Sequence, residues 1–100
     1  MDEKFHGLAK SIGNLQKEAV KQTLLVCEHA IDRIVSSGSK DPKAIEHTLD
    51  ALCEVAFDED VLFLFKKLCR YYYNINSIAT AEYVYIYRNM WGSGDENNTD

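Results

Sequence analysis

The sequence predicts an all-α fold: a small antiparallel four-helix bundle with a long first helix and a disordered acidic C-terminal tail. Apolar residues recur at steps of three and four along most of the chain, which is the spacing of one helix face. There is one proline, and the glycines other than Gly13 lie near the expected helix ends. The stretches between the helices are short, as in a bundle. The chain therefore divides into a single helical domain at 1–91 and a tail at 92–100.

Residues 2–36 predict the long first helix. Its apolar residues are Phe5, Leu8, Ile12, Leu15, Ala19, Val20, Leu24, Cys27, Ile31 and Ile34. We interpret them as one continuous stripe facing the core. Gly13 is a weak point because glycine costs about 1 kcal/mol relative to alanine inside a helix, so the helix starts either at Asp2 or at Ser11 or Asn14. The run Ser-Ser-Gly-Ser at residues 36–39 ends it.

Asp41 and Pro42 predict the start of a second helix, because aspartate caps a helix and proline fits its first turn. A buried stripe follows at Ile45, Leu49, Leu52 and Ala56, and we expect the helix to end near Phe57. The acidic run at residues 58–60 suits the positive N-terminus of a third helix.

The third helix is expected over residues 59–73, with a buried face formed by Val61, Leu64, Phe65, Leu68 and Tyr72. Asn76 or Ser77 caps a fourth helix that runs to Trp91. Its wide apolar arc contains Ala79, Tyr83, Val84, Ile86, Tyr87, Met90 and Trp91. Residues 83–87 (YVYIY) also favour a strand, so helix and strand both remain open for this segment.

Residues 61–91 hold four basic residues and one acidic residue in a chain of net charge −5. The basic residues share the outward side of the last two helices with aromatic rings. This aromatic-basic face consists of Phe63, Lys66, Lys67, Arg70, Tyr73, Tyr85 and Arg88. Aromatic residues and arginine dominate protein-binding hot spots, and rings among cations also stack nucleic-acid bases. The remaining alternative is ordinary surface, with Phe63 packed under the first helix.

The three cysteines, Cys27, Cys53 and Cys69, form no close pair and lie within apolar helical patterns. We expect buried, reduced thiols, which indicate a reducing compartment such as the cytoplasm. A zinc site normally includes a close ligand pair, so we expect no metal site at the cysteines.

A short motif, E-H-x-[IL]-D, occurs twice in the sequence, at residues 28–32 and at residues 46–50. Helices packed side by side could gather these carboxylates and imidazoles around a metal. The alternative is that Glu28, Asp32, Glu46 and Asp50 simply flank apolar stripes, as charged residues commonly do.

The sequence shows no P-loop, no glycine-rich dinucleotide turn and no catalytic triad spacing. The acidic N-terminus is unlike a signal peptide, and the longest apolar run, five residues, is far below the about 20 of a membrane span. We therefore expect a small cytoplasmic protein–protein interaction module, an adaptor or a stoichiometric inhibitor of the immunity type. It would act without catalysis or cofactor, on a protein partner or as a homodimer. The alternatives are a nucleic-acid-binding module using the same face and a weak metal-binding bundle.

Overall fold

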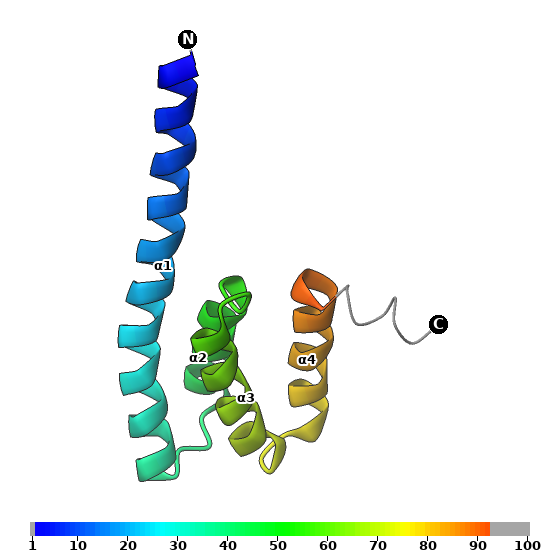
Figure 1. Ribbon diagram of the computed structural model, residues 1–100. Helices are drawn as coiled ribbons and strands as arrows, with labels where there is room; N and C mark the ends of the chain where they lie inside the picture. Colours follow the sequence, from blue (N-terminus) through cyan, green and yellow to red (C-terminus); the bar gives the residue numbers. More distant parts are fainter. Residues whose placement is uncertain (1, 93–100) are drawn as a thin grey trace.

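Four helices make up the described part of the chain (Figure 1). The computed structural model describes residues 2–92, with side chains from residue 16 onward. The helices are α1 (Asp2–Ser37), α2 (Pro42–Glu54), α3 (Glu59–Tyr73) and α4 (Ser77–Trp91). Within residues 2–92 the structure contains no strand, so the all-α prediction is confirmed and residues 83–87 are helical.

Side-chain caps set where the last three helices begin. The Asp41 carboxylate accepts a hydrogen bond from the Lys43 N–H over 3.1 Å. Asp58 accepts from two main-chain N–H groups at the start of α3, and Asn76 does the same for one at the start of α4. Each cap satisfies a donor that has no partner within the helix. Gly38, with φ of +66°, ends α1 in the left-handed conformation that glycine adopts without strain.

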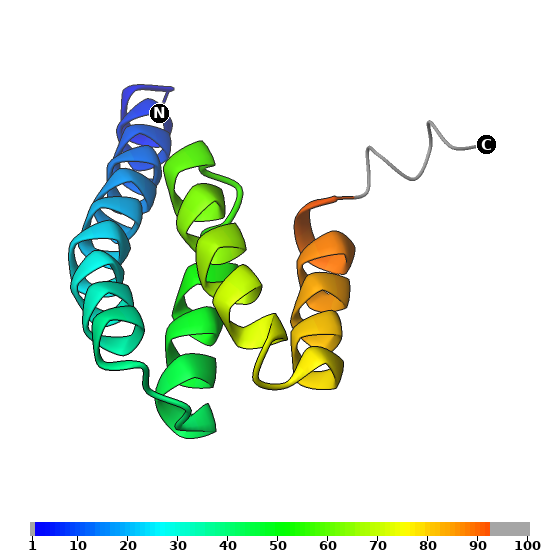
Figure 2. The ribbon, with the colours of Figure 1, turned by 90° about the horizontal axis from the view of Figure 1, so that it is seen from below.

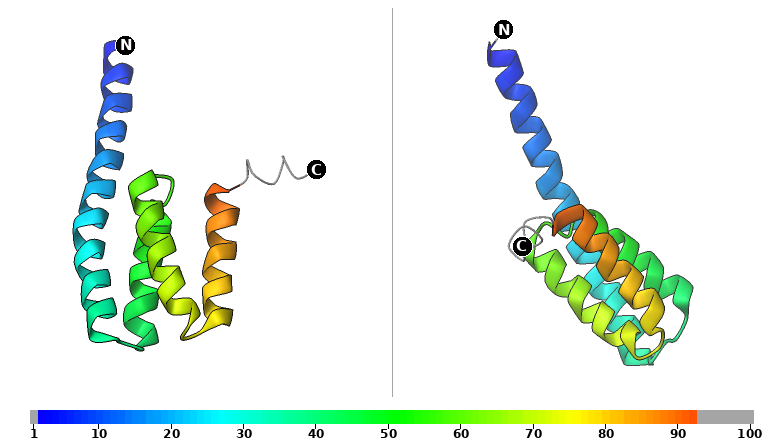
Figure 3. Two further views of the ribbon diagram at one scale, coloured as in Figure 1. Left: turned by 60° about the horizontal axis from the view of Figure 1, so that its bottom comes forward. Right: turned by 90° about the vertical axis from the view of Figure 1, so that its right-hand side faces the viewer.

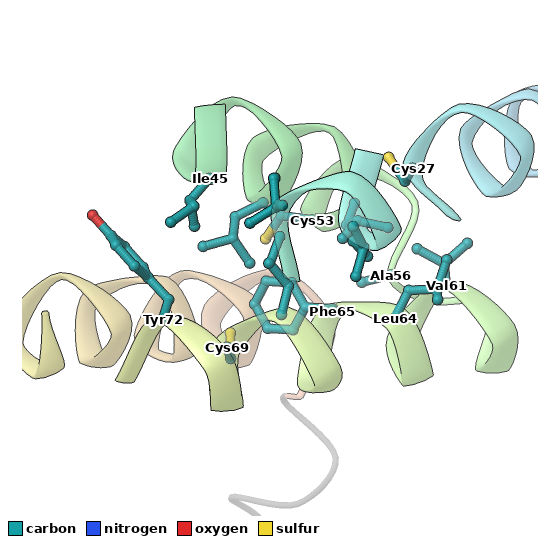
Figure 4. Close-up of a cluster of buried hydrophobic side chains, with 14 residues drawn as sticks. Cys27, Ile45, Cys53, Ala56, Val61, Leu64, Phe65, Cys69 and Tyr72 are labelled. Atoms are coloured by element: carbon teal, nitrogen blue, oxygen red, sulfur yellow. The ribbon is translucent and has the colours of Figure 1, made fainter. Parts of the chain in front are cut away.

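The core lies between α1, α2 and α3, with α3 contributing the most side chains (Figure 4). Its buried apolar members are Cys27, Ile31, Ile34, Ile45, Leu49, Leu52, Cys53, Ala56, Val61, Leu64, Phe65, Leu68, Cys69 and Tyr72. All three cysteines are buried and free, as expected. The spacing of these residues matches the stripes predicted for residues 27–34, 45–56 and 61–72.

Helix α4 lies on the opposite side of α2 and α3 from α1 (Figure 2). It packs mainly on α3 and more lightly on α2. Its inner side presents Thr80, which is buried, and Ala79, Tyr83 and Tyr87, which are half-buried. Because no helix covers α4 from outside within the described chain, most of its surface stays exposed, and its apolar side chains with it.

Two sequence predictions need correction. The second helix ends at Glu54 and not near Phe57, because residues 55–57 form a turn in which the Val55 N–H bonds to the Leu52 carbonyl. The first helix is continuous through Gly13, but its apolar residues do not form one stripe. Ala19 is exposed whereas Val20 packs against the core, and consecutive residues point about 100° apart. The disordered tail was predicted for residues 92–100. Apart from Gly92, these residues lie outside the described part of the chain.

Candidate functional site

A groove runs between α3 and α4, with a volume of about 650 Å³. Its floor combines apolar and aromatic side chains from both helices. The lining residues are Leu62, Phe65, Lys66, Cys69, Arg70, Tyr73, Asn74, Thr80, Val84, Tyr87 and Arg88. At the base, the rings of Phe65 and Tyr87 lie 5.6 Å apart and join the two helices under the groove. This cleft combines a mostly apolar lining with a few polar groups, as ligand and peptide sites do.

Three cations line this groove: Lys66 and Arg70 from α3 and Arg88 from α4. All three are exposed, so their charges remain available to a partner. Tyr73 also lines the groove and is 61% exposed. Four of the seven residues of the predicted aromatic-basic face are therefore brought together around a single cleft.

The other three residues of that face lie outside the groove. Tyr85 lines an open hollow of about 840 Å³ beside α4, which it shares with Ile78, with Tyr73 of α3 and with Glu46 of α2. Phe63 and Lys67 line a smaller hollow of about 330 Å³ between α1 and α3. Phe63 is 67% exposed, so it does not pack under α1. The predicted face therefore divides into a central groove with a patch on either side.

Other aromatic residues of α3 and α4 fasten the helices together through their polar atoms. The Tyr71 hydroxyl donates to the Ser39 carbonyl over 2.7 Å, and the Trp91 Nε1 donates to the Cys53 carbonyl over 2.8 Å. The Tyr83 hydroxyl donates to the Glu46 carbonyl over 3.4 Å. Buried aromatic residues with polar tips commonly find such partners. These rings hold the scaffold of the groove, whereas the side chains of Tyr73 and Tyr85 are mostly exposed.

Burial raises the pKa values of several groups around the core. The pKa of Tyr72 is raised to about 12 by burial and by its hydrogen bond to the Glu46 carboxylate. The pKa of Tyr83 is also raised, by burial and by the carboxylates of Asp50 and Glu46. Burial raises the pKa of the Cys69 thiol to about 11. The thiol that lines the groove is therefore protonated at neutral pH and is a weak nucleophile.

The two E-H-x-[IL]-D motifs are not brought together. Glu28 and Asp32 line the hollow between α1 and α3. The Glu46 carboxylate accepts a hydrogen bond from Tyr72, and Glu46 also lines the hollow beside α4. The Asp50 carboxylate lies close to the Tyr83 hydroxyl. In the part of the chain that the structure describes, no three His, Cys, Asp or Glu side chains converge as a metal would require.

Sequence reasoning did not identify the apolar floor of the groove or its most exposed neighbour. Leu62, Val84 and Tyr87 line the groove, although the pattern placed Val84 and Tyr87 only in the wide apolar arc of the fourth helix. Ile78 is 77% exposed and is not among the residues of the predicted aromatic-basic face. A usable signal was present: apolar residues occupy every side of the α4 sequence, which one packed face cannot bury.

Across residues 2–92, no helix has both the length and the hydropathy needed to cross a bilayer. Comparison of the chain with protein-family models, with curated proteins and with solved structures found no match.

Proposed function

We propose that this protein is a protein–protein interaction module that binds an acidic, amphipathic segment of a partner in the groove between α3 and α4. It acts by docking and not by catalysis. The observation that carries this proposal is that Lys66, Arg70 and Arg88 surround a groove with a mostly apolar floor. A partner segment with apolar residues on one side and carboxylates on its flanks matches both features.

The exposed surface on either side of the groove supports the same function. Ile78, Tyr73 and Tyr85 are each more than half exposed, and aromatic side chains of this kind are enriched at interfaces. Large apolar side chains gathered on one exposed helix are typical of a binding surface, whereas scattered ones are ordinary. A partner that fills the groove would also cover this side of α4, which would extend the interface beyond the groove itself.

The alternative is that a nucleic acid binds this groove through the same three cations. The chain has a net charge of −5, and only three cations line the groove. Neutralising few phosphates releases few counterions, so the electrostatic contribution to binding is small. We therefore favour a protein segment and treat nucleic-acid binding as an outcome of the test.

The test is a selection of displayed peptides on the whole purified chain, followed by affinity measurements on the selected peptides. We expect acidic, amphipathic peptides whose affinity falls about 10- to 100-fold in the double variant Arg70→Glu, Arg88→Glu, since hydrogen bonds to charged groups contribute about 1.5–3 kcal/mol. The matched control is Lys40→Glu, Lys43→Glu, which reverses two exposed charges at the start of α2 and should leave affinity unchanged.

Two results would overturn the proposal. One is a selection in which the recovered peptides bind the Arg70→Glu, Arg88→Glu variant as tightly as the original chain. The other is steeply salt-dependent binding of single-stranded DNA at low salt, abolished by the same variant while no peptide binds. The second result would assign the face to nucleic acid.

A further inference from the structure

The first half of α1 lies beyond the bundle. Figure 3 shows this part of the helix projecting past α2, α3 and α4. Among the described side chains, Val20 is the first that packs against the core, and residues 16–19 are all exposed. At a rise of 1.5 Å per residue, residues 2–19 extend over about 27 Å. The bundle therefore does not account for this segment.

Apolar positions in this segment repeat with a coiled-coil spacing. Steps of three and four connect residues 5, 8, 12, 15, 19, 22 and 26, which we call the outer seam. In sequence these are Phe5, Leu8, Ile12, Leu15, Ala19, Gln22 and Val26. Such alternation gives the period of 3.5 residues that defines heptad positions a and d.

The outer seam is separate from the face that packs into the bundle. The core-facing residues Val20, Leu24, Cys27, Ile31 and Ile34 have the same spacing but begin one residue later. Because one residue turns a helix by about 100°, the two seams face different directions. In agreement, Ala19 is exposed and Val26 is 64% exposed, whereas Cys27 is buried. Where the side chains of α1 are described, the outer seam is therefore exposed at Ala19 and Val26 and does not pack into the bundle.

A lone projecting helix of this composition needs a partner. In proteins most helical stability comes from packing of an apolar face rather than from intrinsic propensity, and among the described side chains of α1 such packing on the bundle begins at Val20. Gly7 and Gly13 each weaken this helix by about 1 kcal/mol. Packing of the outer seam against another helix would supply the missing stabilisation, as in other coiled coils.

The charges beside the outer seam suit a second copy in antiparallel orientation. Counting Phe5 as position a, Lys4 and Glu18 both fall at position g. In an antiparallel pair, g positions of one helix face g positions of the other. A register centred near residue 10 or 11 places Lys4 of each copy opposite Glu18 of the other copy, so this pair occurs twice. The same register places Ser11 of one copy opposite Ser11 of the other. It also sets position 5 against 15 and position 8 against 12.

We propose that residues 5–15 of the outer seam join two copies of this chain as an antiparallel coiled coil, with one bundle at each end. This arrangement keeps the two bundles apart, because the projecting segment of each copy pairs with that of the other. It also leaves both grooves between α3 and α4 open. The inference does not rest on the proposed function.

The first test is light scattering with size-exclusion chromatography over a concentration series. We expect the original chain to give a particle of twice the 11.4 kDa chain mass, and Ile12→Glu to give a monomer with an unchanged melting temperature of the bundle. Lys17→Glu, on the same helix but off the seam, should remain a dimer. A monomer at every concentration, or a dimer that survives Ile12→Glu, would overturn the proposal.

The second test concerns orientation. Glu18→Lys should weaken the dimer several-fold, and adding Lys4→Glu should restore it, because the pair is then exchanged. Ser11→Cys should form a disulfide between copies under mild oxidation, while His6→Cys, on the outer side, should not. A parallel pair places Lys4 opposite Ala9, so loss of the charge rescue together with absence of the Ser11→Cys link would reject the antiparallel register.

Discussion

The hydroxyl of Tyr72 in α3 donates a hydrogen bond to the Oε2 of Glu46 in α2 over 2.5 Å. Tyr72 is fully buried, and Figure 4 shows its ring extending from α3 across the end of the core, with the hydroxyl at its tip. The main-chain carbonyl of Glu46 also accepts from Tyr83 of α4. Glu46 therefore connects α2 to both helices that form the groove.

Removing this hydroxyl should destabilise the fold. Tyr72→Phe is expected to lower the free energy of unfolding by about 2 kcal/mol, because a hydrogen bond to a charged group contributes about 1.5–3 kcal/mol. The neighbouring substitution Tyr73→Phe alters an exposed ring and should change stability by less than about 0.5 kcal/mol. Urea denaturation followed by circular dichroism compares the two. Equal effects would show that the bond does not stabilise the fold.

Stability should fall in alkaline solution. The folded-state pKa of Tyr72, about 12, lies above its ordinary value of 10. The native state therefore holds this proton more tightly, so the stabilisation is complete below pH 10 and is lost as pH rises toward 12. Urea midpoints measured between pH 9 and 11.5 should decline above pH 10 for the original chain and less steeply for Tyr72→Phe. Parallel curves would contradict the assignment.

The three cysteines should react slowly with thiol reagents. All three are buried and free, and burial raises the pKa of each thiol. Little thiolate is then present at pH 8. We expect a disulfide-exchange reagent to label three thiols rapidly in denaturant and far more slowly in the native protein. Rapid labelling of Cys69 in the native protein would show that the floor of the groove is open to the reagent.

Substitution of Trp91 should weaken the packing of α4 against the rest of the bundle. Its indole N–H donates to the Cys53 carbonyl over 2.8 Å, and its ring packs edge-on against Phe57 at 5.2 Å. Trp91→Phe keeps an aromatic ring but loses the donor, which should cost about 1 kcal/mol. The measurement is thermal unfolding by circular dichroism. An unchanged melting temperature would mean that α4 does not depend on this contact.

A pair of leucines tests the assignment of core and surface. Leu68 is fully buried, and Leu25 is 60% exposed. Leu68→Ala should cost about 2–5 kcal/mol because it removes buried methyl groups and leaves a cavity. Leu25→Ala should cost less than about 0.5 kcal/mol, as surface substitutions do. Comparable losses in urea denaturation would place Leu25 in an interface that the single chain does not show.

The helices and their buried faces were predictable because caps and spacing are local properties. Asp41, Asp58 and Asn76 mark helix starts, and Ile45 or Leu68 follow from periodicity alone. The sequence did not reveal that the apolar stripe of α1 shifts to another face between Ala19 and Val20. Both residues are apolar, so the one-residue step between them resembles a continuous stripe.

The site was predictable only in part. That Lys66, Arg70 and Arg88 line one groove depends on how α4 lies against α3. That Phe63 lines a hollow beside α1 depends on how α1 lies against α3. The first of these arrangements depends on contacts between residues far apart in the sequence, such as Tyr83 with Glu46.

The central claim is that the groove between α3 and α4 is the docking site. Nuclear magnetic resonance on the isotope-labelled full chain tests it most directly, by titration with a selected acidic peptide. We expect the largest amide shifts around the groove, at Lys66, Arg70, Thr80, Val84 and Arg88, and small shifts in α1. Shifts concentrated in α1 or spread evenly over the chain, with the groove unaffected, would contradict the claim.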